Sequence, residues 1–133
     1  MTLDVMANSL VYWTQDLVAA DMMGKGGRIF AMTSAGGARV WKTYGAVSAA
    51  KAALESHVRQ LTLELAPMGI TANAIMAGVT DTPALRKIPG SGEMITWAGR
   101  KNPSGRLTTP KDVAEVIGLL SHPKSHWMTG NVL

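Results

Sequence analysis

Two short apolar runs, each bounded by residues that break regular structure, constrain the fold of this chain most. Residues 28–33 follow the glycine-rich segment 24–27, and residues 70–76 follow Pro67 and Gly69. Short apolar runs between such breakers are typical of strands that are buried in a sheet. The sequence therefore predicts one buried strand in each run.

Helical patterns lie before, between and after these two runs. Residues 3–23 and about 44–66 carry apolar side chains every three or four positions, which predicts amphipathic helices. Thr82 and Thr109 each precede a proline, an arrangement typical of an N-cap and the first helical position. The later expected elements are a short helix after Thr82, a helix over residues 93–101, a helix from Pro110 to about Ser121, and a turn that enters a strand at 128–133.

The alternation of helices and strands predicts an α/β fold with a parallel sheet. The chain has 133 residues, of which 47% are hydrophobic and 17% charged, so it is long enough for one globular domain with a core. We expect residues 1–133 to form that single domain.

Composition argues against several other kinds of site. The chain has no cysteine, which excludes disulfides and thiolate metal sites and fits a reducing, cytoplasmic location. His57, His122 and His126 are scattered, so no metal site is expected. The net charge of +4 is spread without a dense basic run, so nucleic-acid binding is not expected. No apolar run is long enough to span a bilayer. A basic surface does suit an anionic cofactor or an acidic carrier protein.

Tyr44 and Lys51 are the residues whose spacing points to chemistry. Seven positions are almost two helical turns, so the phenol and the ammonium are expected to share one face of a helix. A nearby positive charge favours the phenolate form of a tyrosine, which can then exchange a proton during a redox step. Ser34 lies ten residues before Tyr44, at the end of the first predicted strand.

The four residues Asn8, Ser34, Tyr44 and Lys51 resemble the catalytic tetrad of the short-chain dehydrogenase/reductase family. The segment that begins with Lys51 reads Lys-Ala-Ala-Leu, as is typical after the family's catalytic tyrosine. The resemblance covers essentially the whole chain and corresponds to the C-terminal half of that fold. It implies that these four residues are catalytic.

A second group of motifs resembles the family's cofactor loop. Residues 69–74 are similar to the stretch that precedes this loop, and residues 77–82 resemble its Pro-Gly-x-x-x-Thr pattern, with Ala77 in place of the proline. The resemblance implies NADPH or NADH as the cofactor. It also implies that the cofactor is bound by Lys51, Gly78, Val79 and Thr82.

One departure from the family pattern makes the chain more similar to one branch of the family than to the others. Most members have the tyrosine four residues before the lysine, where this chain has Val47; the gap from Tyr44 to Lys51 is typical of enoyl-acyl carrier protein reductases. Residues 81–89 and 102–106 are most similar to the type III enzymes of that group. In a ketone, charge develops on the oxygen bonded to the carbon that accepts hydride, whereas in an enoyl thioester it develops on an oxygen further along the substrate. A tyrosine placed one helical turn earlier, a shift of about 5.4 Å, moves the proton donor in that direction. The resemblance implies an acyl thioester substrate, carried in some cases by acyl carrier protein.

No glycine-rich strand–turn–helix for a pyrophosphate precedes these motifs. We therefore expect a partial Rossmann-like, doubly wound parallel sheet without the N-terminal nucleotide-binding half, and weak or no activity from the isolated chain. The family packs two helices across its dimer interface, which implies a homo-oligomer through residues 3–23 and 44–66. The alternatives are a ketoreductase or alcohol dehydrogenase of the same family and a catalytically dead oligomerisation fragment.

Each candidate residue also has a purely structural interpretation. Tyr44 is equally suited to packing at a helix start, and a lone lysine such as Lys51 is most often a solvated charge. Ser34 suits a turn, Asn8 a hydrogen bond within a helix bend, and Thr82 an N-cap.

Overall fold

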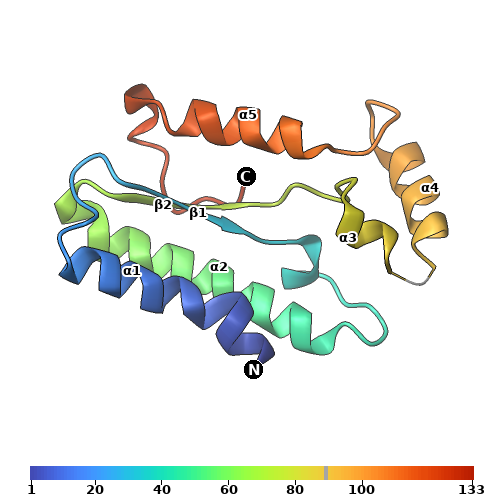
Figure 1. Ribbon diagram of the computed structural model, residues 1–133, viewed down its shortest axis with the longest axis horizontal. Coiled ribbons are helices and arrows are strands. Elements are labelled where there is room, and N and C mark those ends of the chain that lie inside the picture. The colour runs from blue at the N-terminus through green and yellow to red at the C-terminus, as the bar shows by residue number, and fades with distance from the viewer. Residues whose placement is uncertain (89) are drawn as a thin grey trace. The chain divides into compact units, whose positions relative to one another are not determined.

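A computed structural model describes residues 1–88 and 90–133 and divides the chain into two compact units (Figure 1). The first unit contains Met1–Met76 together with Ser121–Leu133, and the second contains Ala77–Leu120. The prediction that residues 1–133 form one domain stays a prediction.

The first unit contains a parallel sheet. Strand β1 (Arg28–Met32) pairs with β2 (Thr71–Ile75) in a parallel register that runs from Arg28 opposite Thr71 to Met32 opposite Ile75. Val132 forms a further parallel bridge with Ala74, so the end of the chain lies along β2. The predicted α/β class, both strands and the strand-like pairing near residue 132 are confirmed.

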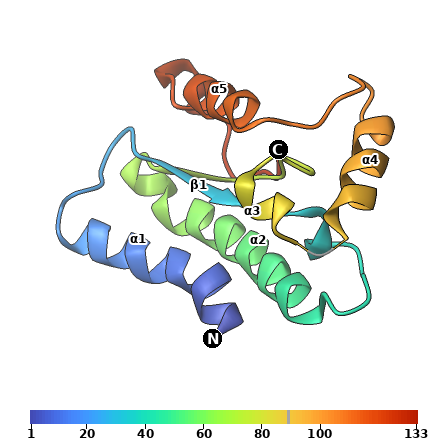
Figure 2. The ribbon, with the colours of Figure 1, turned by 45° about the vertical axis from the view of Figure 1, so that its right-hand side comes forward.

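Two helical segments cover one face of this sheet (Figures 1 and 2). The first consists of the π-helical turn η1 (Asp4–Asn8) and α1 (Ser9–Ala19), and the second is α2 (Gly45–Leu65). Their apolar side chains and those of the strands exclude water from one continuous core, which is the main source of stability in such a unit. The core consists of Ala7, Ile29, Ala31, Ala50, Leu54, Val58, Leu61, Leu65, Ile70, Ala72 and Ala74.

The first helix ends earlier than the sequence predicts, because Asp21 rather than Gly24 terminates it. Asp21 adopts a left-handed φ of 53°. Its N–H donates to the carbonyl of Val18 at 3.1 Å, and the Met22 N–H donates to the carbonyl of Leu17 at 2.9 Å. These two bonds form a Schellman motif, which more often has glycine at the left-handed position. The prediction of a helix to residue 23 is therefore wrong by four residues.

The end of α2 agrees with the prediction. A single 3-10 turn, η3 (Ala66–Met68), follows the helix and contains Pro67. Gly69 then adopts φ +70°, a conformation that glycine accepts without steric cost, and leads into β2. The start of the helix agrees to within one residue, since Tyr44 is the N-cap rather than the first helical residue.

The second unit contains α3 (Pro83–Arg86), α4 (Ser91–Lys101) and α5 (Pro110–Leu120). The Oγ1 atom of Thr82 accepts a hydrogen bond from the Leu85 N–H at 3.1 Å, which confirms the predicted N-cap. Thr80 and Thr108 form a parallel bridge between the segments that precede α3 and α5. These elements match the helices predicted from the two Thr-Pro pairs and from residues 93–101.

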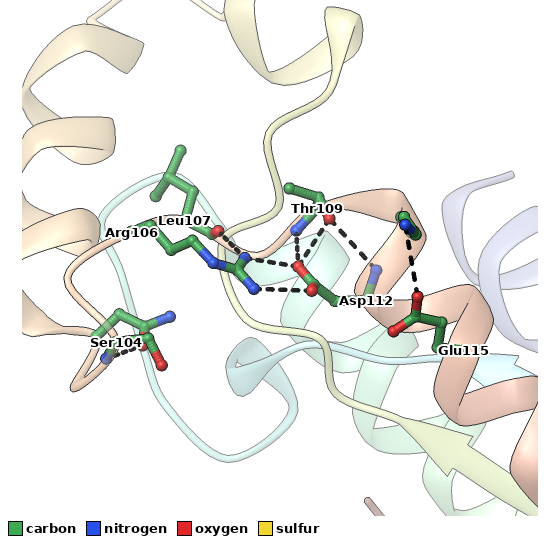
Figure 3. A network of polar contacts seen from close by, with 8 residues as sticks. Ser104, Arg106, Leu107, Thr109, Asp112 and Glu115 are labelled. Atoms are coloured by element: carbon green, nitrogen blue, oxygen red, sulfur yellow. Dashed lines mark hydrogen bonds and ion pairs between the residues drawn. The ribbon is translucent and has the colours of Figure 1, made fainter.

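A network of polar contacts fixes the start of α5 (Figure 3). The Asp112 carboxylate accepts hydrogen bonds at 2.7 Å from both the N–H and the hydroxyl of Thr109. The Arg106 guanidinium binds the same carboxylate through two N–H groups, at 2.7 and 2.8 Å. These contacts hold the pKa of Asp112 well below its usual range, with the Arg106 hydrogen bonds as the largest cause. A carboxylate in the first turn also interacts favourably with the helix dipole.

Candidate active site

A short turn at the carboxyl end of β1 positions Ser34. The turn is a 3-10 helix, η2 (Ala35–Gly37), and Ser34 is its N-cap with extended backbone angles. The Ser34 Oγ atom accepts a hydrogen bond from the Gly36 N–H at 3.2 Å, which orients the hydroxyl. Ser34 therefore has the structural role of a cap, and its half-buried hydroxyl also faces a second side chain.

That second side chain is Tyr44. Its hydroxyl lies 3.4 Å from the Ser34 Oγ atom, within hydrogen-bonding distance. The tyrosine ring packs against the backbone of Gly36, where a Cβ atom would lie only 3.0 Å from the Tyr44 Cδ1 atom. Trp41 packs edge-on against the ring, with 5.3 Å between the ring centroids. Ser34, Gly36 and Trp41 together confine the phenol at the start of α2.

Lys51 lies on α2, nearly two turns after Tyr44, and its side chain is half-buried. The ammonium donates a hydrogen bond to the carbonyl of Met32, the last residue of β1, at 2.6 Å. Burial lowers the pKa of Lys51 below its ordinary value of 10.5, because a charged ammonium is less stable away from water. The structure thus brings Ser34, Tyr44 and Lys51 to the same end of β1.

Asn8 makes different contacts. Its Nδ2 group donates to the Asp4 carboxylate at 2.9 Å, and its Oδ1 atom lies 3.0 Å from the His57 Nε2 atom on α2. These contacts tie the π-helical turn to α2. Within the described part of the chain, no side-chain hydrogen bond joins Asn8 to Ser34, Tyr44 or Lys51. The catalytic role that the resemblance implies for Asn8 stays a prediction.

The residues expected to bind the cofactor, apart from Lys51, belong to the second unit. Gly78 adopts φ +75°, and among the described residues no heavy atom apart from those of Gly78 and its two chain neighbours lies within 4 Å of the place that a Cβ atom would occupy. Thr82 caps α3 through its hydroxyl, and Val79 is half-buried. A left-handed glycine with open space beside it allows a ligand to approach the main chain closely.

Two further residues on α2 contact this region and were not predicted from the sequence. The Ser48 hydroxyl donates to the Gly36 carbonyl at 2.6 Å. Glu55 accepts a hydrogen bond from the Thr33 hydroxyl at 2.7 Å. A signal for both exists in the sequence, because positions 44, 48, 51 and 55 recur at helical spacing and all carry polar side chains.

A parallel α/β fold with a serine, a tyrosine and a lysine at the carboxyl end of one strand defines the class of short-chain dehydrogenases and reductases, and comparison with known proteins agrees. The family model described as enoyl-(acyl carrier protein) reductase matches residues 1–133. The chain belongs to this family, and the resemblance inferred from the sequence is confirmed.

Individual relatives show the same relationship. The chain is 35% identical over 114 residues to an NADH-dependent enoyl-[acyl-carrier-protein] reductase of Rhizobium meliloti, an alignment that covers 86% of this chain and 42% of the relative. The crystal structure of the NADH-dependent enoyl-[acyl-carrier-protein] reductase of Aquifex aeolicus superposes with a TM-score of 0.88 at 33% identity and covers 98% of this chain and 50% of that one.

The reductase LugOII, which catalyses keto-reduction at C1 during lugdunomycin biosynthesis, has a TM-score of 0.83 at 30% identity. The match covers 99% of this chain and 52% of LugOII. The chain therefore spans about half the length of the relatives it matches. In the described residues, no helix combines the length and apolar character needed to cross a membrane.

Proposed function

We propose that the chain carries the catalytic residues of an NAD(P)H-dependent reductase that acts on enoyl thioesters. The observation that supports this most is the convergence of Ser34, Tyr44 and Lys51 at the carboxyl end of β1. Ligands of open parallel sheets bind outside the carboxyl ends of the strands. A tyrosine and a lysine in that position suit proton transfer during a reduction.

Residues of each unit, taken separately, suit contacts to a nicotinamide cofactor. The Lys51 ammonium has three N–H donors and contacts the Met32 carbonyl, so it retains capacity to bind ribose hydroxyls. Gly78 offers open main chain, and we assign the remaining contacts to Val79 and Thr82. The relatives from Rhizobium meliloti and Aquifex aeolicus are NADH enzymes by name. When bound, the cofactor supplies the hydride.

The protein's own residues would stabilise the negative charge that develops on the substrate oxygen and would supply a proton to that oxygen. The Tyr44 hydroxyl donates a hydrogen bond, and then a proton, to the oxygen that gains charge in the substrate. Ser34 holds the phenol through its hydroxyl, 3.4 Å away. Lys51, at the same end of β1, would offer positive charge to the negative charge that develops in the transition state. Tyr44 precedes Val47, the usual tyrosine position, by nearly one turn, which suits an enolate oxygen better than a ketone oxygen.

The proposed binding partners are an acidic carrier protein and a second copy of this chain. A net charge of +4 favours association with an acidic carrier such as acyl carrier protein. The first helical segment exposes Val5, Tyr12 and Trp13, and α2 exposes Leu63. Exposed apolar side chains on both helices support self-association through residues 3–23 and 44–66.

Parallel assays with two thioesters test the reaction. Crotonyl and acetoacetyl thioesters are offered to the purified chain with NADH and with NADPH, and cofactor oxidation is followed. Because only weak activity is expected from the isolated chain, we expect slow reduction that is faster with the crotonyl thioester. Tyr44→Phe should lower that rate by at least about 100-fold, because a general acid contributes roughly this factor. Tyr12→Phe is the matched control, since Tyr12 is exposed on α1 and should leave the rate unchanged.

The other outcomes identify the alternatives. The similarity to LugOII favours the second candidate, a ketoreductase, and faster reduction of the acetoacetyl thioester would support it. No reaction with either thioester, together with no effect of Tyr44→Phe on any measured property, would instead support an oligomerisation fragment.

A further inference from the structure

A stripe of polar side chains at the start and on one face of α2 faces residues 32–37, which run from the end of β1 through η2. Each of its side chains contacts a different part of that segment, as the site geometry shows: Tyr44 contacts Ser34 and Gly36, Ser48 the Gly36 carbonyl, Lys51 the Met32 carbonyl, and Glu55 the Thr33 hydroxyl. Because these positions are three or four residues apart, they form one face of the helix. The proposed reaction uses neither Ser48 nor Glu55, and Glu55 is the charged one of these two.

Glu55 contacts the turn at both of its ends. Before the turn, the hydroxyl of Thr33, which is only 8% exposed, donates to the Glu55 Oε1 atom at 2.7 Å. At the last residue of the turn, the carboxylate lies beside Gly37, where a Cβ atom would approach the Glu55 Oε1 atom to 2.8 Å. A hydrogen bond to a carboxylate in a partly buried place is stronger than one between neutral groups. One side chain therefore restrains residues on both sides of Ser34 and Gly36.

We propose that Glu55 is a positioning residue for Tyr44. The carboxylate binds Thr33 and lies beside Gly37, and the residues from Ser34 to Gly36 present the hydroxyl and the backbone that confine the phenol. Glu55 itself does not touch Tyr44 and acts through this turn. The importance of Glu55 for the reaction rests on the proposed function of Tyr44. The effect of Glu55 on the position of Tyr44 can be measured without any turnover of substrate.

The test is NMR of the full chain with ¹³C at the Cζ atom of tyrosine. The chain has two tyrosines, so a Tyr12→Phe background leaves Tyr44 as the single signal. In Glu55→Ala the Tyr44 signal should move and broaden by about twofold or more, because a released turn samples several conformations. Glu55→Gln keeps an oxygen that accepts from Thr33, and should restore most of the parent signal.

Glu64→Gln is the matched control. It removes the same charge from the same helix, but the Glu64 carboxylate binds the exposed Gln60 and is remote in sequence from the stripe. The Tyr44 signal should therefore remain where it is in the parent. An equal change in Glu64→Gln and Glu55→Ala would overturn the proposal, since it would show a general effect of charge.

Thr33→Val provides a second test if Glu55→Ala fails to fold. It removes the hydroxyl that Glu55 binds and preserves the shape of the side chain. An unmoved, sharp Tyr44 signal in folded Glu55→Ala or Thr33→Val would refute the positioning role. Because the signal does not depend on activity, the positioning role is tested even if the isolated chain is inactive, and assays of activity test the proposed reaction alone.

Discussion

The Tyr44 ring lies directly against the backbone of Gly36, and the hydroxyl of that ring lies 3.4 Å from the Ser34 hydroxyl. The absence of a side chain at residue 36 is what leaves room for the ring. This relationship makes a glycine in the η2 turn part of the candidate active site, although it carries no reactive group.

Gly36→Ala should displace Tyr44. The added methyl group would lie 3.0 Å from the Tyr44 Cδ1 atom and 3.2 Å from the Ser34 Oγ atom. Overpacking of this kind costs about 1 to 3 kcal/mol of stability. We expect a lower midpoint in urea unfolding and a shifted Tyr44 signal in NMR. Gly45→Ala on α2 is the control, because nothing lies within 4 Å of its Cβ position and alanine favours a helix. Equal loss of stability in both variants would contradict the steric explanation.

Lys51 should make the stability of the chain rise in alkaline solution. Burial lowers its pKa in the folded state, so folding is penalised while the ammonium is charged in both states. This penalty is complete below the folded pKa and disappears as the pH rises from there through the ordinary value of 10.5.

Urea unfolding of the parent and of Lys51→Met, from about pH 8 to about pH 11.5, measures this effect. The free energy of unfolding of the parent should rise relative to that of the variant over this range. A constant difference between the two would show that burial of Lys51 does not penalise its charge.

Asp112 should contribute stability that is lost in acid. The Arg106 guanidinium and Thr109 lower the pKa of this carboxyl, so the contribution is complete above the ordinary carboxyl pKa of 3.8 and is lost as the pH falls toward the folded value. Circular dichroism of parent and Asp112→Asn over the acid range should show a smaller loss of helix in the variant. Removing the largest cause with Arg106→Gln should move the loss to higher pH, and an unchanged profile would contradict the assigned cause.

Leu54→Ala should strongly destabilise the first unit. Leu54 is 5% exposed on α2 and belongs to the core between the helices and the sheet. A buried leucine truncated to alanine costs about 2 to 5 kcal/mol, depending on how far the cavity collapses. Leu63 lies on the same helix but is 72% exposed, so Leu63→Ala should change the free energy of unfolding by less than about 0.5 kcal/mol. Urea unfolding measures both variants. A similar loss of unfolding free energy in Leu54→Ala and Leu63→Ala would contradict the assignment of Leu54 to the core-facing side of α2.

Local patterns predicted most of the elements. Both strands, the end of α2 at Pro67 and Gly69, and the caps at Thr82 and Thr109 depend on residues that are close in sequence. The end of α1 was mispredicted because Asp21 takes a left-handed conformation for which a nearby glycine seemed better suited. Even this error is local, and it affects a few residues rather than the order of elements.

The sequence by itself determined the α/β alternation and the shared helical face of Tyr44 and Lys51, since both follow from periodicity along the chain. Only the tertiary structure decided which side chains meet at the carboxyl end of β1. Asn8 binds His57, and Glu55 binds Thr33, across separations of 49 and 22 residues. Such contacts depend on how α2 packs against the sheet and against the turn that follows β1. The spacing of residues within one helix does not determine this packing.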